Sequence, residues 1–408
     1  MKYCLIGEKL GHSYSKIIHE KVGLNYDLVE IERENLGDFF KNCVFSGFNV
    51  TIPYKKSVIE YLSYLSPIAK SAGAVNTVVN KDGKFYGYNT DVGGMDYMIK
   101  RVNLSLKDKN VMILGSGGTS NTAVTLAKIN NAKSITVVSR NGEVNYENCY
   151  DYKDTQIIIN ATPVGMFPNP YNKPIELKPF KKLEGVFDCI YNPKNTELIS
   201  EAKALNIACE SGLSMLVEQA LLARDIWLET THDSSLTESI IKQIRKLTSN
   251  IVLCGMPSAG KTSVGKIIAK KLNLQFFDSD DEIFKSYGKT PAEIIKSQSE
   301  NEFRDIESKV VKDLSIKSGA VISLGGGAIL REENVKNLKR NGTIVYIKRD
   351  LDKLILKDRP LSQKQGIKDL YEKRKDIYNK VSDLIVENNG AVEECAKKVI
   401  EEYEITCN

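Results

Sequence analysis

A glycine-rich segment in the middle of the chain limits the possible folds more than any other feature. Residues 255–262 read GMPSAGKT and directly follow the apolar run 251–254. The spacing Gly-x4-Gly-Lys-Thr between a strand and a helix predicts a phosphate-binding loop, in which backbone N–H groups hold anionic oxygens. Lys261 is then expected to meet the β- and γ-phosphates, and the Thr262 hydroxyl to hold Mg²⁺. The alternative is an ordinary glycine turn between a strand and a helix.

Length and composition favour a soluble globular protein of several domains. The chain has 408 residues, which suggests two or three domains, and 42% of them are hydrophobic and 27% charged. No stretch approaches the roughly 18 apolar residues of a membrane helix, and the N-terminal sequence lacks the parts of a secretory signal. We therefore expect a cytoplasmic protein that does not act at a membrane.

The spacing of the cysteines argues against a metal-binding protein, and the distribution of charge argues against a nucleic-acid-binding protein. The 8 cysteines form no C-x-x-C pair, and no histidine lies at metal-binding spacing, so we expect reduced and mostly buried thiols. The net charge of +5 is spread along the chain and forms no basic block. This distribution favours small anions over nucleic acid as ligands. It leaves the oligomeric state open.

The first 90 or so residues alternate between strand-like and helical patterns, which predicts an α/β unit. The strand-like runs are 3–6, 27–31, 47–50 and 77–80, and the helical patterns are 16–22, 36–43 and 56–62. Polar side chains lie near the ends of these runs, where α/β proteins build substrate clefts: Ser13, Ser15, Thr51, Lys55, Asn76 and Asp91. Ser13 and Ser15 could equally cap the helix that follows them.

A second glycine turn follows the strand-like run 110–114. Residues 115–118 read GSGG and open a helical pattern, after which a further strand is expected at 134–139. This βαβ order predicts a dinucleotide site, with the pyrophosphate at the helix N-terminus. Arg140 stands where NAD-binding proteins usually carry an acid, which favours NADP, although it could also be an ordinary surface arginine.

The remaining patterns extend both units. Before the phosphate loop we expect strands at 156–159 and 185–188 and helices at 198–205, 215–230 and 236–247. After it we expect helices at 263–272, 291–314, 332–340 and around 371–378, and strands at 320–324 and 343–347. Strand and helix alternate again, which predicts a parallel sheet covered by helices on both faces. The fold class is therefore α/β throughout.

The first 248 residues together resemble the shikimate dehydrogenase family. Its motifs stand here as Ser13-Tyr-Ser15, as NVTIPYK at 49–55, as Asn89-Thr-Asp91 and as GLSMLVEQ at 212–219. The resemblance implies NADPH-dependent reduction of 3-dehydroshikimate to shikimate. In such a reaction a protonated lysine, Lys55, can supply the proton to the developing alkoxide.

The resemblance also implies a role for each motif residue. Asp91 would bind a ring hydroxyl and hold Lys55, while the substrate set is Ser13, Ser15, Thr51, Asn76, Asp91, Tyr191 and Gln219. The cofactor set is Gly115, Ser116, Gly117, Gly118, Thr119, Ser139, Arg140, Cys189 and Gly212. Lys16 and Val92 replace a proline and a glycine that are common in the family. The short interval between Arg140 and Asn160 predicts a trimmed nucleotide domain.

Residues 250 to about 400 resemble the shikimate kinase family. Its motifs stand as Asp278-Ser-Asp280, as FRDIE at 303–307, as three glycines at 325–327, as RPL at 359–361 and as RKDIY at 374–378. The implied ATP-binding set is Ser258, Ala259, Gly260, Lys261, Thr262, Ser263 and Arg359, with Mg²⁺ at Thr262 and Asp278. The implied shikimate-binding set is Asp280, Arg304, Gly326 and Arg374, with Asp280 and Lys261 as catalytic groups.

Simpler explanations exist for parts of the second unit. Arg304 and Glu307 could be an ordinary i,i+3 pair on a helix surface, and Asp278 and Asp280 could lie in a solvated loop. The interval between Asp358 and Asp369 is short for the lid of this family.

The predicted domains are 1–92, completed by helices at about 213–248, then a Rossmann-like NADP domain at 93–212 and a P-loop kinase domain at 250–408. The resulting hypothesis is a cytoplasmic enzyme with two activities, which acts in the shikimate pathway towards chorismate and aromatic amino acids. Its partners would be small molecules only. One alternative is a quinate/shikimate dehydrogenase that prefers NAD, fused to another small-molecule kinase. The other is a sensing or scaffold protein with one inactive unit.

Overall fold

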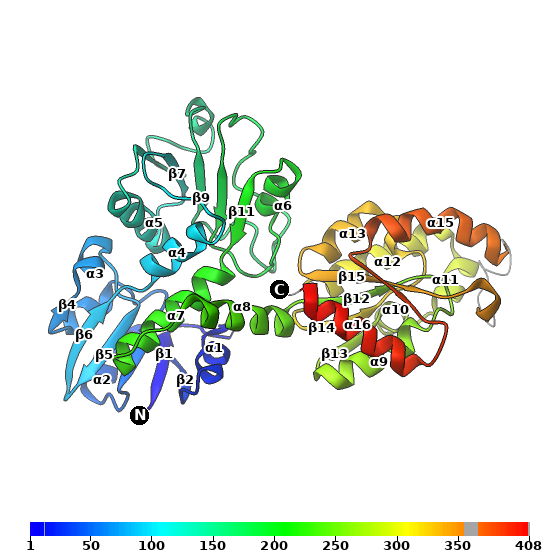
Figure 1. Ribbon diagram of the computed structural model, residues 1–408, viewed down its shortest axis with the longest axis horizontal. Coiled ribbons are helices and arrows are strands. Elements are labelled where there is room, and N and C mark those ends of the chain that lie inside the picture. The colour runs from blue at the N-terminus through cyan, green and yellow to red at the C-terminus, as the bar shows by residue number, and fades with distance from the viewer. Residues whose placement is uncertain (12, 355–365, 407–408) are drawn as a thin grey trace. The chain divides into compact units, whose positions relative to one another are not determined.

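The computed structural model describes residues 1–11, 13–354 and 366–406. The chain divides into two compact units, Met1–Ile244 and Arg245–Asn408 (Figure 1). Both units are built from parallel or mixed sheets covered by helices, so the predicted α/β class is confirmed. The finer domain limits inside the first unit stay a prediction.

The first unit opens with a 6-stranded sheet of order β2-β1-β3-β5-β6-β4. Its strands are β1 (Tyr3–Gly7), β2 (Tyr26–Glu30), β3 (Gly47–Val50), β4 (Tyr64–Leu65), β5 (Thr77–Lys81) and β6 (Lys84–Tyr88). Strand β1 runs parallel to β2 and β3, whereas β5 is antiparallel to β3 and to β6. The helices that connect these strands are α1 (Ser15–Lys21), η1 (Arg33–Asn35), α2 (Leu36–Lys41), η2 (Ser57–Tyr61) and α3 (Pro67–Ala72).

Alternate residues of β1 enter different cores, because side chains of a strand point to opposite faces. Ile6 packs with Phe48 on one face, whereas Tyr3 packs with Trp227 on the other. The rings of Tyr3 and Trp227 stack with their centroids 4.8 Å apart. This contact holds α7 (Leu213–Leu228) against the first sheet, although the two segments lie far apart in the sequence.

The second sheet of this unit is parallel throughout, with the order β11-β10-β9-β7-β8. Its strands are β7 (Asn110–Leu114), β8 (Ser134–Val138), β9 (Ile157–Asn160), β10 (Gly185–Asp188) and β11 (Ala208–Ser211), and its helices are α5 (Gly118–Ile129), η3 (Cys149–Asp151) and α6 (Glu197–Ala204). Only the short helix η3 separates β8 from β9. The trimming expected from the short interval after Arg140 is therefore confirmed, and β8 forms an edge of the sheet.

Two helices connect the two sheets of the first unit, because α7 packs on the first sheet and α4 (Asp91–Lys100) packs on the second. Helix α4 packs closely on α7 (Figure 1). The close approach requires glycine, since a Cβ on Gly94 would lie 2.5 Å from the carbonyl oxygen of Met215. Helix α8 (Ser234–Thr248) follows α7 and buries Ile240, Ile241 and Ile244.

The second unit is a 5-stranded parallel sheet of order β13-β14-β12-β15-β16. Its strands are β12 (Asn250–Cys254), β13 (Gln275–Asp278), β14 (Ala320–Ser323), β15 (Gly342–Lys348) and β16 (Leu384–Glu387). Its helices are α9 (Lys261–Leu272), α10 (Ser279–Tyr287), α11 (Pro291–Ser297), α12 (Glu300–Ser315), η4 (Ala328–Leu330), α13 (Glu332–Lys339), η5 (Leu351–Lys353), α15 (Ile367–Val381) and α16 (Val392–Thr406).

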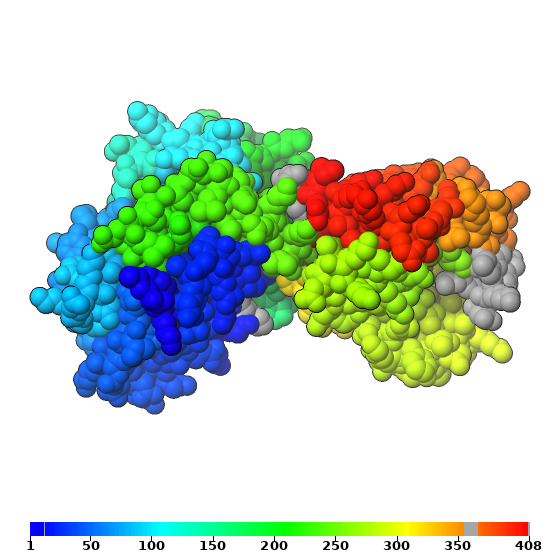
Figure 2. Space-filling model, turned by 60° about the horizontal axis from the view of Figure 1, so that its bottom comes forward, coloured from blue at the N-terminus to red at the C-terminus, as the bar shows by residue number. Residues whose placement is uncertain are grey.

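Helices cover both faces of this sheet, as predicted. Ile251 and Val252, successive residues of β12, belong to different cores. Helices α9 and α16 lie side by side over one face (Figures 1 and 2). The unit begins inside α8, where the Thr248 carbonyl accepts hydrogen bonds from Gly319 N at 2.9 Å, Ser318 Oγ at 3.0 Å and Asn341 Nδ2 at 2.9 Å.

Two predicted helices differ from the structure. The single helix expected at 291–314 is two helices, because the first ends at Ser297 and Ser299 caps the second by accepting a hydrogen bond from the backbone N–H of Glu302. The helical pattern at 56–62 forms only the short 3₁₀ helix η2. In the described part of the chain, no helix combines the length and the apolar character needed to cross a bilayer. The cysteines there are free thiols.

Candidate active sites

The glycine turn of the first unit connects β7 to α5. Gly115 has a φ of +107°, and a Cβ there would lie 3.1 Å from Thr162 Cγ2, so this position needs glycine. Gly117 and Gly118 have open space where their Cβ atoms would lie, directly at the N-terminus of α5. Backbone N–H groups in this exposed turn can therefore approach a pyrophosphate.

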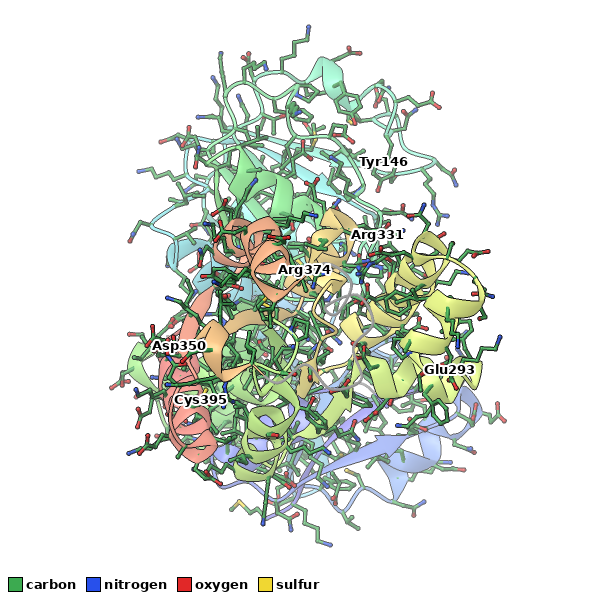
Figure 3. The ribbon with its side chains drawn as sticks, turned by 90° about the vertical axis from the view of Figure 1, so that its right-hand side faces the viewer. Tyr146, Glu293, Arg331, Asp350, Arg374 and Cys395 are labelled. Atoms are coloured by element: carbon green, nitrogen blue, oxygen red, sulfur yellow. The ribbon has the colours of Figure 1, made fainter. Side chains whose placement is uncertain are left out.

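The residues after β8 form a turn at the edge of the same sheet. Ser139 is half-buried, and its backbone N–H donates to the carbonyl oxygen of Val144 at 3.1 Å. Arg140 is exposed, and its charge acts on Tyr146, whose pKa is raised by burial and partly lowered again by that arginine. Tyr146 lies in the loop between β8 and β9 (Figure 3). Sequence patterns gave no signal for Tyr146.

A cavity of about 560 Å³ lies in the first unit beside the glycine turn. All the substrate-binding residues predicted for the first unit line it, together with three of the predicted cofactor residues. The predicted residues on its wall are Ser13, Ser15, Thr51, Lys55, Asn76, Asp91, Thr119, Cys189, Tyr191, Gly212 and Gln219. Segments from both sheets thus meet at one hollow.

Lys55 and Asp91 form an ion pair at the centre of this wall. The Lys55 Nζ lies 2.6 Å from Asp91 Oδ2, and the two side chains are 24% and 12% exposed. The other carboxylate oxygen, Oδ1, accepts a hydrogen bond from Asn76 Nδ2 at 2.9 Å. Asp91 is the first residue of α4, where the helix dipole favours a negative charge. The ammonium group is therefore held facing the cavity by a carboxylate that is itself fixed.

Asn76 extends this hydrogen-bond network. Its amide nitrogen also donates to Thr90 Oγ1 at 2.9 Å and lies 3.3 Å from Gln219 Oε1. The Gln219 amide nitrogen in turn donates to the carbonyl oxygen of Leu216 at 2.8 Å, which orients the side chain. The predicted amide groups therefore act as one rigid set.

Asn49 is a cavity residue that was absent from the predicted site set, although it opens the motif at 49–55. Its Oδ1 accepts from Tyr26 Oη at 2.7 Å and lies 3.1 Å from His19 Nε2, and its Nδ2 donates to Thr77 Oγ1 at 3.1 Å. Burial lowers the pKa of His19 to about 3, so this ring is neutral. Asn49 therefore stiffens the floor of the cavity, and its position at a strand end was the available signal.

The serines of the first loop lie at the start of α1. Ser13 Oγ accepts a hydrogen bond from the backbone N–H of Ser15 at 3.2 Å, and Ser15 begins the helix. Both hydroxyls also line the cavity. Tyr191 lies across from this loop with its ring 5.1 Å from that of Tyr14, and burial raises its pKa to about 12. The site therefore gathers neutral hydroxyl groups around the Lys55 ammonium.

At the cavity wall nearest the second sheet, the backbone at Gly212 passes very close to the backbone at Cys189. A Cβ on Gly212 would lie 2.1 Å from the carbonyl oxygen of Cys189. Below this crossing, Asp188 accepts hydrogen bonds from Thr196 Oγ1 at 2.6 Å and from Ile190 N at 3.0 Å. Burial raises the pKa of Asp188 to about 7, against the effect of these hydrogen bonds. Gly212 is thus required by packing at the cavity edge.

The phosphate-binding loop of the second unit has the expected geometry between β12 and α9. Three of its residues have positive φ: Gly255 at +144°, Ser258 at +65° and Gly260 at +91°. A Cβ on Gly255 would lie 2.5 Å from the carbonyl oxygen of Ile347. The Lys261 Nζ is buried and donates to the carbonyl oxygens of Gly255 and Met256 at 3.1 and 3.0 Å. The loop thus wraps around its lysine.

Thr262 and Asp278 meet beside this loop. The Thr262 hydroxyl donates to Asp278 Oδ2 at 2.8 Å, while Asp278 Oδ1 accepts from the backbone N–H of Asp280 at 3.1 Å. Asp278 caps α10, and Asp280 lies in its first turn, so the alternative of a solvated loop is wrong. One hydroxyl and one carboxylate are the protein oxygens that a Mg²⁺ ion with phosphate and water ligands would need. Among the described residues no group of three or more His, Cys, Asp or Glu is placed to hold a metal.

The three glycines 325–327 are the point where the predicted substrate residues converge. A Cβ on Gly325 would lie 2.9 Å from Asp280 Oδ1, and one on Gly327 would lie 2.4 Å from the Arg304 guanidinium. The Gly326 carbonyl accepts from Arg374 Nη1 at 3.0 Å and from Tyr378 Oη at 2.6 Å. Arg374 comes from α15 (Figure 3). An acid and two arginines therefore surround one glycine turn.

Arg304 is buried together with Glu307. Arg304 Nη1 donates to Glu307 Oε2 at 2.6 Å, and the two side chains are 11% and 1% exposed. The alternative of an ordinary pair on the helix surface is therefore wrong. Burial raises the pKa of Glu307, although Arg304 works against that shift. Arg359, predicted to bind ATP, lies outside the described residues.

These two sites define the class of protein. A glycine turn that opens a helix beside a cavity with a fixed ammonium group is the arrangement of a dinucleotide-dependent oxidoreductase. A phosphate-binding loop next to paired arginines and an acid is the arrangement of a kinase for a small acidic substrate. The chain thus joins an oxidoreductase to a P-loop kinase.

Comparison with known proteins gives the family. Residues 5–78 match the family model for the shikimate dehydrogenase substrate binding domain, and residues 257–404 match that for shikimate kinase. The chain is 38% identical over 259 residues to shikimate dehydrogenase (NADP(+)) of Clostridium beijerinckii, which covers 58% of this chain and 96% of that relative. The corresponding Clostridium perfringens protein is 36% identical over 264 residues, covering 59% and 97%. The chain therefore belongs to the shikimate dehydrogenase family and carries a shikimate kinase domain after it.

Solved structures agree with this assignment for the first unit. A chorismate mutase/shikimate 5-dehydrogenase fusion protein from Clostridium acetobutylicum matches with a TM-score of 0.56 and 36% identity, covering 58% of this chain and 94% of that one. Shikimate 5-dehydrogenase from Thermus thermophilus, in complex with NADP(H) and shikimate, matches with a TM-score of 0.54 and 27% identity, covering 59% and 98%.

Proposed function

We propose that the chain is a bifunctional enzyme of the shikimate pathway. Its first unit reduces 3-dehydroshikimate to shikimate with NADPH, and its second unit phosphorylates shikimate to shikimate 3-phosphate with ATP and Mg²⁺. The family membership of each unit supports both reactions. We place both reactions in the cytoplasm, where these nucleotides are available. The two sites would then act on the same six-membered ring acid in sequence.

The ion pair between Lys55 and Asp91 carries the proposal for the first unit. When bound at the glycine turn, NADPH supplies a hydride to the ring carbonyl carbon, and the carbonyl oxygen takes up a proton. Lys55 is the group placed to give this proton, because its ammonium faces the cavity at 2.6 Å from the Asp91 carboxylate. Asp91 holds the lysine and can accept a hydrogen bond from a neighbouring ring hydroxyl.

The remaining cavity residues would orient the substrate. Ser13, Ser15 and Tyr191 offer hydroxyl groups to a carboxylate, which is the charged end of the proposed substrate. Thr51, Asn76 and Gln219 would bind the other polar groups of the ring. On the cofactor side, exposed Arg140 can pair with a 2′-phosphate, which agrees with the NADP-dependent relatives.

The convergence of Arg304, Arg374 and Asp280 on the glycine turn carries the proposal for the second unit. The two guanidinium groups can grip the carboxylate of shikimate. Asp280 can then orient the attacking hydroxyl and accept its proton. Bound ATP supplies the phosphoryl group, and Lys261 with Mg²⁺ at Thr262 and Asp278 would stabilise the charge on it. Arg359 would add a further cation.

A coupled assay tests both activities in one chain. The purified protein receives 3-dehydroshikimate, NADPH, ATP and Mg²⁺, and the product is separated by chromatography. We expect shikimate 3-phosphate to form with one NADPH oxidised for each ATP consumed. Accumulation of shikimate without its phosphate, or failure to consume NADPH, would refute the corresponding half of the proposal.

Two single substitutions test whether the sites are independent. We expect Lys55→Ala to lower the dehydrogenase kcat by about a hundredfold or more, the usual size of a general acid contribution, and to spare the kinase. Lys261→Ala is expected to abolish the kinase and to spare NADPH oxidation. Loss of both activities from either substitution would contradict separate sites. Thermal melting of each variant checks that the protein remains folded.

A further inference from the structure

Arg349 stands out among the described arginines of the second unit, because no described residue is a hydrogen-bond or ion-pair partner of its guanidinium group. It is the residue directly after β15 and is only partly exposed. Its Nε is buried, and no described residue accepts a hydrogen bond from it. Among the described residues, its guanidinium group forms no ion pair. By contrast, the two nearest lysines are paired with acids: Lys348 with Glu387 at 3.6 Å and Lys353 with Asp350 at 3.5 Å.

The sheet places Arg349 against the phosphate-binding loop. Strands β12 and β15 are neighbours, with Cys254 opposite Tyr346, so both chains leave the sheet at the same edge. A Cβ on Gly260, the last glycine of the loop, would lie 3.7 Å from Arg349 Nη1. The arginine therefore lies beside the residue that precedes Lys261.

Asn388, at the end of β16, fixes this arrangement from the other side. Its Nδ2 donates to the carbonyl oxygen of Ala259 at 2.7 Å, and its backbone N–H donates to the carbonyl oxygen of Lys348 at 2.7 Å. The next residue, Asn389, accepts from the backbone N–H of Asp350 at 2.9 Å. In Figure 3, Asp350 appears on the same side of the unit as Cys395 of α16, away from Arg374. The phosphate-binding loop and the backbone next to Arg349 are thus both held by the end of β16, away from Arg374 on the substrate side.

Burying a guanidinium group partly without a carboxylate partner is unfavourable unless another anion pairs with its charge. The loop beside it is built to hold phosphate oxygens, and a guanidinium fork matches their geometry. Lys261 occupies the inside of the loop, whereas Arg349 lies outside Gly260, so the two cations would reach different parts of a phosphate chain.

We propose that Arg349 is a nucleotide-binding residue of the kinase, which holds the phosphate chain of ATP or ADP from outside the loop. This inference rests on the proposed function of the second unit as an ATP-dependent kinase. The contact forms with the bound nucleotide before transfer, so it strengthens binding and raises the rate at low ATP, without a separate effect on kcat.

Titration of the full-length chain with ADP, followed by calorimetry, tests this contact without catalysis. Saturating NADP keeps ADP out of the dinucleotide site. We expect Arg349→Gln to weaken ADP binding by about ten- to a hundredfold, the size of a charge-assisted hydrogen bond, and to raise the KM for ATP similarly with little change in kcat. Arg349→Lys should retain most of the affinity, and added salt should weaken ADP binding less in Arg349→Gln than in the native chain.

Lys348→Gln is the matched control, because it removes a neighbouring cation that already has a carboxylate partner. The control should bind ADP within about twofold of the native chain, as expected for a surface charge. If Lys348→Gln loses as much affinity as Arg349→Gln, or if Arg349→Gln binds ADP like the native protein, the inference is wrong. A native chain that binds no ADP would instead refute the proposed kinase function itself.

Discussion

The buried pair of Arg304 and Glu307 allows a stability effect to be separated from a functional effect. Replacing Arg304 by Met leaves Glu307, which is 1% exposed, without the Nη1 donor at 2.6 Å. Its other oxygen, Oε1, already has no hydrogen-bond partner in the part of the chain that the structure describes. Breaking a buried pair from one side costs about 3–5 kcal/mol. Because burial already raises the pKa of Glu307, protonation limits the loss, and we expect about 3 kcal/mol near neutral pH.

The assay is thermal unfolding of the second unit together with both activities. A loss of about 3 kcal/mol corresponds to a melting temperature lower by roughly 6–12 °C for a unit of this size. Kinase kcat/KM should fall by about a thousandfold, because the substrate carboxylate loses one of its guanidinium partners. The dehydrogenase activity is an internal control and should not change.

The double variant Arg304→Met/Glu307→Leu completes the test. Removing both charges should return the melting temperature to within a few degrees of the native value, since an apolar pair of similar volume replaces the ions. The kinase should stay inactive. Recovery of kinase activity in the double variant would refute the role of Arg304 in substrate binding. A double variant as unstable as the single one would refute the energetic coupling of the pair.

Two further predictions concern the first unit. Burial alone would lower the pKa of His232, but two carboxylates outweigh this effect and raise the pKa. Asp225 lies 2.6 Å from His232 Nδ1, and Glu218 lies 3.2 Å from Nε2. The stabilisation from these pairs is complete below the unfolded pKa of histidine and is lost as pH rises through the higher folded pKa. In urea unfolding, His232→Asn should therefore destabilise the protein more at about pH 6 than at about pH 9. Equal losses at the two pH values would contradict the pairing. Gly212→Ala should cost about 1–3 kcal/mol and impair the dehydrogenase, because its Cβ would lie 2.1 Å from the Cys189 carbonyl oxygen. The control Gly37→Ala, whose nearest contact is 3.5 Å away, should be nearly neutral by the same melting assay.

Local features of the sequence predicted much of the fold. Strands such as β3, β7 and β10 have the expected limits, because short apolar runs between turn residues determine them. Strands β4, β6, β11 and β16 and helices α3, α10 and α16 had no predicted counterpart. Helix α10 was missed because Asp278 and Asp280 looked like loop acids, whereas the first caps the helix and the second begins it.

Which residues meet in each site depends on contacts between segments that are distant in the sequence, and short sequence patterns do not show such contacts. The two glycine turns were evident, since each combines a strand, glycines and a helix within a few residues. In contrast, Arg304 and Arg374 come from different helices and meet only at residues 325–327. Their pairing was expected only from the resemblance to a family. Tyr146 and Arg349 gain their positions from tertiary packing, so spacing could not have identified them, whereas Asn49 could have been identified from its place at a strand end.

The hydrogen bonds to the Thr248 carbonyl have a practical consequence for separating the two activities. The second unit begins at Arg245, within α8, and not at its first strand. An expression fragment that starts at Asn250 would leave Gly319 N, Ser318 Oγ and Asn341 Nδ2 without their shared acceptor. The segment that looks like a linker is therefore a structural part of the kinase, and a stable excised kinase has to carry the last turn of α8 with it.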